Sequence, residues 1–293
     1  MQLGISTHVF LPQRLTPALL DALARTGVAV IEVFATRHHF DYTERAAVKE
    51  LAAWFASNHV APTMHMPIFT EDEEANWSRH TSATLNLIDT NKSARIAAMD
   101  EVKRALEAAE SIPFKSCVVH LGLREDHWNT RTLDDSMTAI EHLKAFASPM
   151  GVKLLLENLV NDVAKPAHLK EIVRAGHFSS VGYCLDTGHA NLAEVEQEAD
   201  DSAQKTGLDT AFALFGESVR ELHLHDNHGS VGGAGKDEHL WPGDGTIAWN
   251  SVVTQAAKLK EAPIGMLEIS YEIGADEKTI LERVKRAAEM LSA

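Results

Sequence analysis

Short apolar runs recur along this chain, and most of them stop at a side chain that can bind a metal ion. Eight such runs alternate with stretches of helical periodicity, and they span residues 3–6, 28–34, 60–65, 116–120, 152–157, 181–186, 219–225 and 264–269. Strands that alternate with helices form parallel sheets, and eight strand–helix units close naturally into a barrel. We therefore expect one α/β domain over residues 1–293, a (β/α)8 TIM barrel.

The segments between the strands carry the spacing and the caps of helices. The helices are expected at residues 16–26, 43–57, 93–111, 133–147, 166–175, 208–216, 248–259 and 276–291. Three connections after strands are long, at residues 66–92, 187–207 and 226–247, and loops of this length are usually functional. A doubly wound open sheet is the alternative. It gathers ligands at one crevice, whereas here candidate ligands end strands three to eight.

Composition narrows the classes of function. No run of about 18 apolar residues occurs, so we expect no membrane span. The amino terminus lacks the features of a signal peptide, which favours a cytoplasmic location.

The formal net charge is −15, which disfavours a nucleic-acid partner, although a local positive groove remains compatible with it. Cys117 and Cys184 lie inside predicted strands and are expected to be reduced thiols.

Acids and histidines at strand ends form the candidate site. Glu157 and Glu268 each follow an apolar run, and a buried carboxylate is costly unless it is paired or bound to a cation. An ion pair at the barrel mouth is the alternative for each. Asp186 ends another strand, and His189 follows three residues later. His223 and His225 are two residues apart, so on a strand they face the same way.

Two glutamates, an aspartate and a histidine suit one divalent ion, which can be manganese, zinc, cobalt or magnesium. Further ligand-like side chains could enlarge this to two or three zinc ions. They are His65, His120, His189, Asp237 and His239.

Several segments carry a resemblance to a known family. They are LLLENL, CLDTGHAN, HLHDN followed by DEHLWPGDGTIAW, and MLEIS. With these segments the chain resembles the xylose isomerase-like (β/α)8 barrels over nearly its whole length. That group includes sugar and sugar-phosphate isomerases, ketose 3-epimerases, inosose dehydratases and endonuclease IV-type apurinic/apyrimidinic endonucleases.

The resemblance implies a ligand set and roles. It assigns the shared metal to Glu157, Asp186, His223 and Glu268, and the register of His223-Leu224-His225-Asp226 leaves His225 as a substrate contact or a group behind the ligands. The endonuclease branch has further zinc ligands, and His65, His120, His189, Asp237 and His239 stand at the corresponding positions. The DNA-intercalating loops of that branch are not recognisable here.

The leading functional hypothesis is an isomerase or epimerase that acts on a sugar, sugar phosphate or cyclitol-like polyol. A metal-coordinated carbonyl acidifies the neighbouring C–H and stabilises an enediolate, while Glu157 and Glu268 serve as acid and base. The alternative is zinc-dependent hydrolysis of a phosphodiester at an abasic site. A metal-stabilised barrel that only binds a ligand is a third hypothesis. The sequence leaves the oligomeric state open, and a homo-oligomer is compatible with it.

Overall fold

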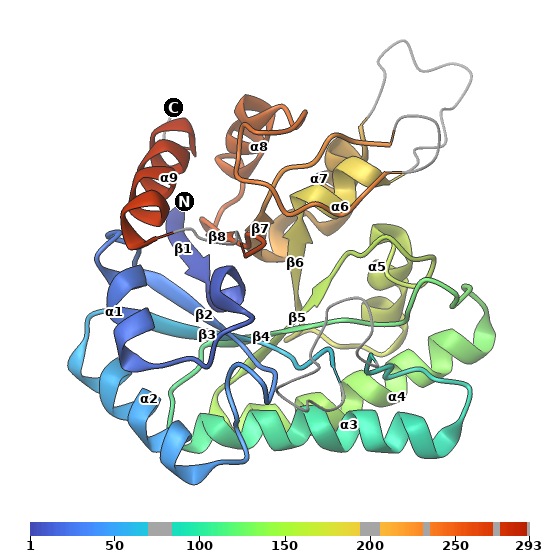
Figure 1. The fold of residues 1–293 in the computed structure, drawn as a ribbon. Coiled ribbons are helices and arrows are strands. Elements are labelled where there is room, and N and C mark those ends of the chain that lie inside the picture. Colours follow the sequence, from blue (N-terminus) through green and yellow to red (C-terminus); the bar gives the residue numbers. More distant parts are fainter. Residues whose placement is uncertain (70–83, 194–205, 231–234, 272–275, 292–293) are drawn as a thin grey trace.

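Eight parallel strands close into a barrel in the computed structural model, which describes residues 1–69, 84–193, 206–230, 235–271 and 276–291 (Figure 1). The strands follow one another in chain order around the barrel, and β1 pairs with both β2 and β8. They are β1 (Gln2–Ser6), β2 (Val30–Phe34), β3 (Ala61–His65), β4 (Ser116–Val119), β5 (Lys153–Glu157), β6 (Gly182–Asp186), β7 (Val219–Leu224) and β8 (Ile264–Leu267). The expected (β/α)8 barrel is confirmed, and the open sheet is excluded.

Helices lie around the outside of the strands (Figure 1). In the described residues they are α1 (Pro17–Ala24), α2 (Arg45–Ser57), α3 (Lys92–Leu106), α4 (Thr130–Ala147), α5 (Pro166–Ala175), α6 (Thr187–Leu192), α7 (Gly207–Phe215), α8 (Trp249–Ala256) and α9 (Glu277–Leu291). The hydroxyl of Thr16 caps α1 by accepting a hydrogen bond from the backbone of Leu19. Within the described residues, every helix is too short or too polar to cross a bilayer.

One of the expected long loops contains a helix. Residues 187–207 were expected to form a long connection with no helix assigned to it, but α6 begins directly after β6. The Asp186 side chain caps this helix, since its Oδ1 accepts a hydrogen bond of 2.6 Å from the backbone nitrogen of His189. Residues 194–205 lie outside the described part, as do 70–83 and 231–234 of the other two long connections.

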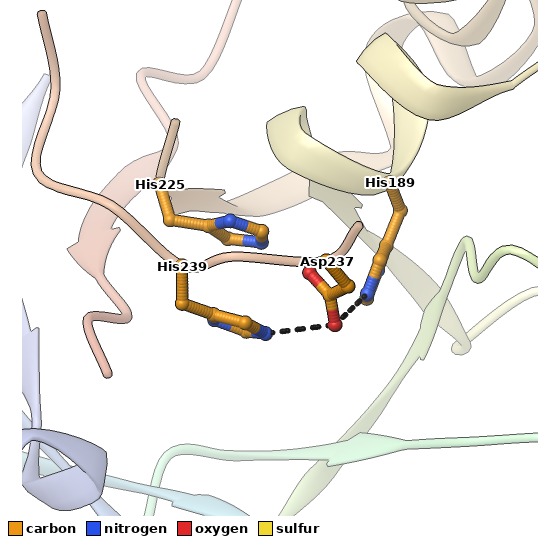
Figure 2. A group of neighbouring side chains, drawn as sticks. All are labelled: His189, His225, Asp237 and His239. Carbon is orange, nitrogen blue, oxygen red and sulfur yellow. Dashed lines mark hydrogen bonds and ion pairs between the residues drawn. The ribbon is translucent and has the colours of Figure 1, made fainter. Parts of the chain in front are cut away.

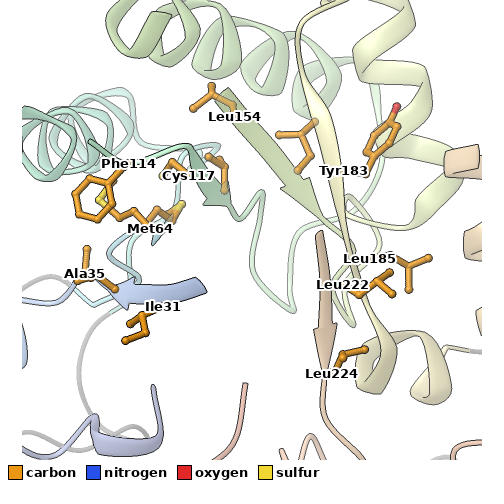
Figure 3. Packing of buried hydrophobic residues seen from close by; sticks show 14 of the residues in the cluster. Ile31, Ala35, Met64, Phe114, Cys117, Leu154, Tyr183, Leu185, Leu222 and Leu224 are labelled. Atoms are coloured by element: carbon orange, nitrogen blue, oxygen red, sulfur yellow. The ribbon is translucent and has the colours of Figure 1, made fainter. Parts of the chain in front are cut away.

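Two separate apolar clusters follow from the alternation of side chains along each strand. The larger one joins strand side chains such as Ile31, Met64 and Leu222 to the inner faces of the helices (Figure 3). Full burial of a side chain of this size contributes roughly 1.5–3 kcal/mol, so this layer holds the strands in place. The smaller cluster lies inside the barrel and consists of Val118, Leu155 and Cys184. Both cysteines are free and buried, as expected.

The barrel interior also holds buried polar side chains where such barrels usually carry branched apolar ones. They are Glu32, Thr63, Ser116 and Glu221. The barrel is therefore polar below its carboxyl-terminal end as well as at that end.

Candidate metal centre

The candidate ligands meet at the carboxyl-terminal end of the barrel because all parallel strands end there. His65, Glu157 and Asp186 are the last residues of β3, β5 and β6, and His223 lies within β7. His120, His225 and Glu268, which were expected inside strands, directly follow β4, β7 and β8 instead. The assigned end of a strand commonly differs by a residue or two from the expected one. The three side chains therefore still lie at the carboxyl-terminal end of the barrel. The remaining candidates are His189 on α6 and the pair Asp237 and His239 in the loop after β7.

Four of these side chains form the central set, defined as Glu157, Asp186, His223 and Glu268. One ligand atom from each lies within 4.8 Å of the others, and all four residues are buried. The His223 Nδ1 atom is 3.4 Å from Glu157 Oε2, 3.3 Å from Glu268 Oε2 and 3.9 Å from Asp186 Oδ2. Two ligands bound to one zinc ion at a tetrahedral angle would be roughly 3.4 Å apart. The spacing therefore fits a shared ion.

An unsatisfied buried atom supports the same conclusion. His223 Nδ1 forms no hydrogen bond to any described residue, although its side chain is 0 % exposed. Buried polar atoms normally have a partner, and a ring nitrogen that faces three carboxylates is well placed to bind a cation. The residues present thus fit a divalent ion.

A second group, the β3 set, shares Glu157 with the central set and adds His65 and His120. The Nε2 atoms of the two histidines are 3.0 Å apart, and His120 Nε2 is 2.9 Å from Glu157 Oε2. The Nδ1 of His65 donates to the backbone oxygen of Met66, at 2.8 Å, which leaves the lone pair of His65 on Nε2. Glu157 is therefore placed to bridge two ions.

The third group comprises His189, His225, Asp237 and His239 (Figure 2). We call its members His189, Asp237 and His239 the loop set. Asp237 Oδ2 lies between the two rings, 3.4 Å from His189 Nε2 and 3.0 Å from His239 Nε2. The Nδ1 atoms of both histidines face backbone oxygens, those of Asn158 and Glu268, at 2.9 Å. Each Nδ1 then donates its proton to the backbone, so Nε2 is the nitrogen of each ring that would bind an ion.

His225 lies behind these ligands. Its Nε2 is 2.8 Å from Asp186 Oδ2, and its ring stacks on His239 with centroids 3.8 Å apart (Figure 2). Gly188 makes room for this ring, because a Cβ atom there would meet the His225 ring at 2.0 Å. The arrangement is consistent with His225 orienting Asp186.

Asp226 fastens the loop that carries Asp237 and His239. Its Oδ1 accepts hydrogen bonds from the backbone of Asn227 and Ile247, and its Oδ2 accepts from the backbone of Gly243 and the indole of Trp249. All four distances fall between 2.9 and 3.1 Å. The fully buried carboxylate thus ties both ends of the loop to the barrel.

Two buried residues of this region, His8 and Glu32, were not predicted as site residues from the sequence. His8, after β1, lies near His239 and Glu268. Glu32, inside β2, faces His223. His8 follows an apolar strand as the other candidates do, and Glu32 interrupts an apolar run, so the same signals could have identified both.

The charges at the site govern its protonation. Burial by itself raises the pKa of Glu157, but the charges of His120 and His223 hold that pKa well below its usual value. Burial by itself lowers the pKa of His189, but Asp186 and Asp237 raise it well above 6.5. In the absence of an ion, the neighbouring carboxylates therefore hold a proton on His189, whereas burial lowers the pKa of His120.

This protonation predicts that ion affinity rises with pH. His189 holds a proton at neutral pH in the ion-free site and must release it when Nε2 binds an ion. We expect affinity to increase roughly tenfold per pH unit for each proton released, as long as the pH stays below the raised pKa. Calorimetry in buffers of different ionisation enthalpy would count the protons, and His189→Asn should lower the count. Affinity that stays constant from about pH 6 to 8 would contradict the prediction.

Two adjoining cavities open next to the ligands. The first, of about 130 Å³, is lined by His8, Phe34, Glu157, Glu268 and other residues of the centre. The second, of about 240 Å³, has mainly apolar walls and one arginine, Arg124. Together they offer space for a small molecule in contact with the carboxylates.

Sequence comparison then decides the family. A family profile described as xylose isomerase-like TIM barrel matches residues 20–292. The chain belongs to this family. The uncharacterized protein MJ1311 of Methanocaldococcus jannaschii is 26% identical over 294 residues, which cover 97% of this chain and 86% of that protein. The probable endonuclease 4 of Haloarcula marismortui is 25% identical over 215 residues, which cover 71% and 76%.

Solved structures share the xylose isomerase-like barrel. A D-tagatose 3-epimerase-like protein superposes with a TM-score of 0.73 at 22% identity, covering 100% of this chain and 98% of that one. The IOLI protein with a bound zinc atom gives a TM-score of 0.77 at 17% identity with the same coverage. At these identities the likeness establishes the fold. Family membership and fold agree with the resemblance drawn from the sequence segments.

Proposed function

We propose that this chain is a divalent-metal-dependent isomerase or epimerase of a small sugar, sugar phosphate or related polyol. One observation carries the proposal. Carboxylate oxygens of Glu157 and Glu268 lie 3.4 and 3.3 Å from the same nitrogen of His223, and both residues line the smaller cavity. A substrate carbon in that cavity would lie within reach of both carboxylates.

The chemistry follows from these positions. A divalent ion in the central set would supply Lewis acidity toward a substrate carbonyl and its neighbouring hydroxyl. Glu157 would take the proton from the carbon between them, and Glu268, in its acid form, would give a proton to the opposite face. Proton exchange of the two carboxyl groups with solvent water would then return both to their starting protonation states. His189 and His239, which also line the cavity, would contact substrate hydroxyls.

Charge and fold support a small substrate. Arg124 carries the only permanent positive charge among the described residues that line the two cavities. Several cations normally contact a nucleic-acid backbone, and the formal net charge here is −15. The epimerase-like structural neighbour shares the barrel over its whole length. These observations favour a small polyol over a nucleic acid.

Solvent deuterium tests the proposal because it labels the reacting carbon whichever product forms. The metal-loaded protein would be incubated in D2O with a panel of ketohexoses, their phosphates and inososes, and followed by NMR and sugar chromatography. We expect deuterium at the carbon next to the carbonyl, or an epimer or isomer, for at least one compound. Glu268→Gln should abolish both signals while the barrel stays folded. A metal-loaded protein that changes no compound of the panel would contradict the proposal.

A second function has a specific observation in its favour. The central, β3 and loop sets provide ligands for three ions, and Glu157 is shared between two sets. Multinuclear sites of this kind suit hydrolysis of phosphate esters. The relative from Haloarcula marismortui, a probable endonuclease 4, points in the same direction. We therefore keep zinc-dependent phosphodiester hydrolysis as the alternative.

Metal counting and a cleavage assay separate the two functions. Elemental analysis after dialysis should give about one tightly bound ion for the isomerase, and two or three zinc ions for the hydrolase. A duplex with a single abasic site serves as the hydrolase substrate. Cleavage at that site which a chelator suppresses, together with three bound zinc ions, would favour hydrolysis.

A further inference from the structure

Glu32 is a fully buried acid in the middle of β2, away from the strand ends where the other candidates lie. Its neighbours along the strand are Ile31 and Val33, which belong to the apolar layer under the helices. Glu32 itself points the other way, into the barrel interior, where a fully buried carboxylate is costly to keep ionised unless a partner compensates it. We therefore expect the buried Glu32 carboxylate to have a specific partner inside the barrel.

That contact is with a ligand of the central set. Glu32 Oε2 is 3.3 Å from His223 Nε2, and both side chains are 0 % exposed. The opposite ring nitrogen, Nδ1, faces Glu157 and Glu268 and makes no hydrogen bond to a described residue. The ring thus presents one nitrogen to the ion site and the other to Glu32.

A histidine binds an ion only through a nitrogen that carries a lone pair. His223 can use Nδ1 only if its proton is on Nε2, and an anionic acceptor at Nε2 holds it there. The same acceptor makes the ring a stronger ligand. We propose that Glu32 is a positioning residue that fixes the tautomer of His223 for ion binding in the central set. The inference rests on the ion site of the proposed function.

The barrel provides a matched control for this role. Glu221 is also a fully buried glutamate of the barrel interior, and it lies two residues before His223 on β7. Within the part of the chain that the structure describes, its hydrogen-bond partner is Ser116, at 3.4 Å. Burial and the neighbouring Glu32 raise the pKa of Glu221 to about 8, so at neutral pH this carboxyl is mostly protonated. Glu221→Gln therefore changes a buried carboxyl of the same interior without removing the acceptor at His223 Nε2.

The experiment compares ion affinity in Glu32→Gln, Glu32→Asp and Glu221→Gln. Competition with a chelator gives the affinity for Co²⁺ and Zn²⁺, and the Co²⁺ absorption spectrum reports the ligands. Loss of a group that orients a ligating histidine typically costs about 10–100-fold in metal affinity. We expect this loss for Glu32→Gln, partial recovery for Glu32→Asp, and a change below about threefold for Glu221→Gln.

Contrary results are distinguishable. Wild-type affinity in a folded Glu32→Gln variant would overturn the positioning role and leave the proposed function intact. A wild-type protein that binds no divalent ion would overturn both. If Glu32→Gln fails to fold, ¹⁵N NMR of the wild type decides, because a proton on His223 Nδ1 in the ion-bound protein contradicts the inference. A proton on Nε2 supports it.

Discussion

Replacing Glu157 by Gln is expected to remove the ion of the central set, together with any ion of the β3 set, and to reduce turnover at least about a thousandfold, since a Lewis acid contributes several kcal/mol. Glu157 Oε2 is 2.9 Å from His120 Nε2 and 3.4 Å from His223 Nδ1, so it belongs to both the β3 and the central set. The amide has nearly the same shape as the carboxylate but no charge. Elemental analysis and the deuterium assay measure the two effects.

An exposed glutamate serves as the control for this variant. Glu110 lies on the surface after α3, and Glu110→Gln should keep both metal content and turnover. Circular dichroism would show that Glu157→Gln still forms the barrel. A folded Glu157→Gln protein with full metal content and undiminished turnover would refute the role given to this residue under either function.

Replacing Asp226 by Ala is expected to release the loop that carries Asp237 and His239. The substitution removes an acceptor of four hydrogen bonds, and each hydrogen bond to a charged group contributes about 1.5–3 kcal/mol. We expect the melting temperature to fall by roughly 5 °C or more. Under the hydrolase alternative, in which the loop set holds an ion, that ion should be lost while the central set keeps its own.

Asp226→Asn is expected to have a smaller effect on stability than Asp226→Ala. Its remaining oxygen can still accept from Asn227 and Ile247, but its amide nitrogen cannot accept from Gly243 and Trp249. An intermediate melting temperature is therefore expected, and under the hydrolase alternative partial occupancy of the loop set as well. Thermal denaturation and metal counting give these values. A melting temperature of Asp226→Ala equal to that of the wild type would show that the loop keeps its place without this carboxylate.

The alternation of apolar strands and amphipathic helices was enough to predict the barrel. Parallel strands bring their carboxyl ends to one end of a barrel, so residues such as His65 and Glu157 could be placed together from their positions alone. The same argument predicted candidate ligands at the ends of β3 to β8. It missed α6, because the cap that begins this helix is the side chain of Asp186, a residue read as a metal ligand.

The sequence by itself determined which strands carry donors and where those donors gather, since both follow from the two-residue period of a strand and the direction of the chain. Only the tertiary structure decided which nitrogen of each ring faces the centre and how the donors divide into sets. These features depend on contacts between distant segments, as when Glu32 meets His223, 191 positions further along the chain. No local pattern encodes such a contact, because it forms only when the barrel closes.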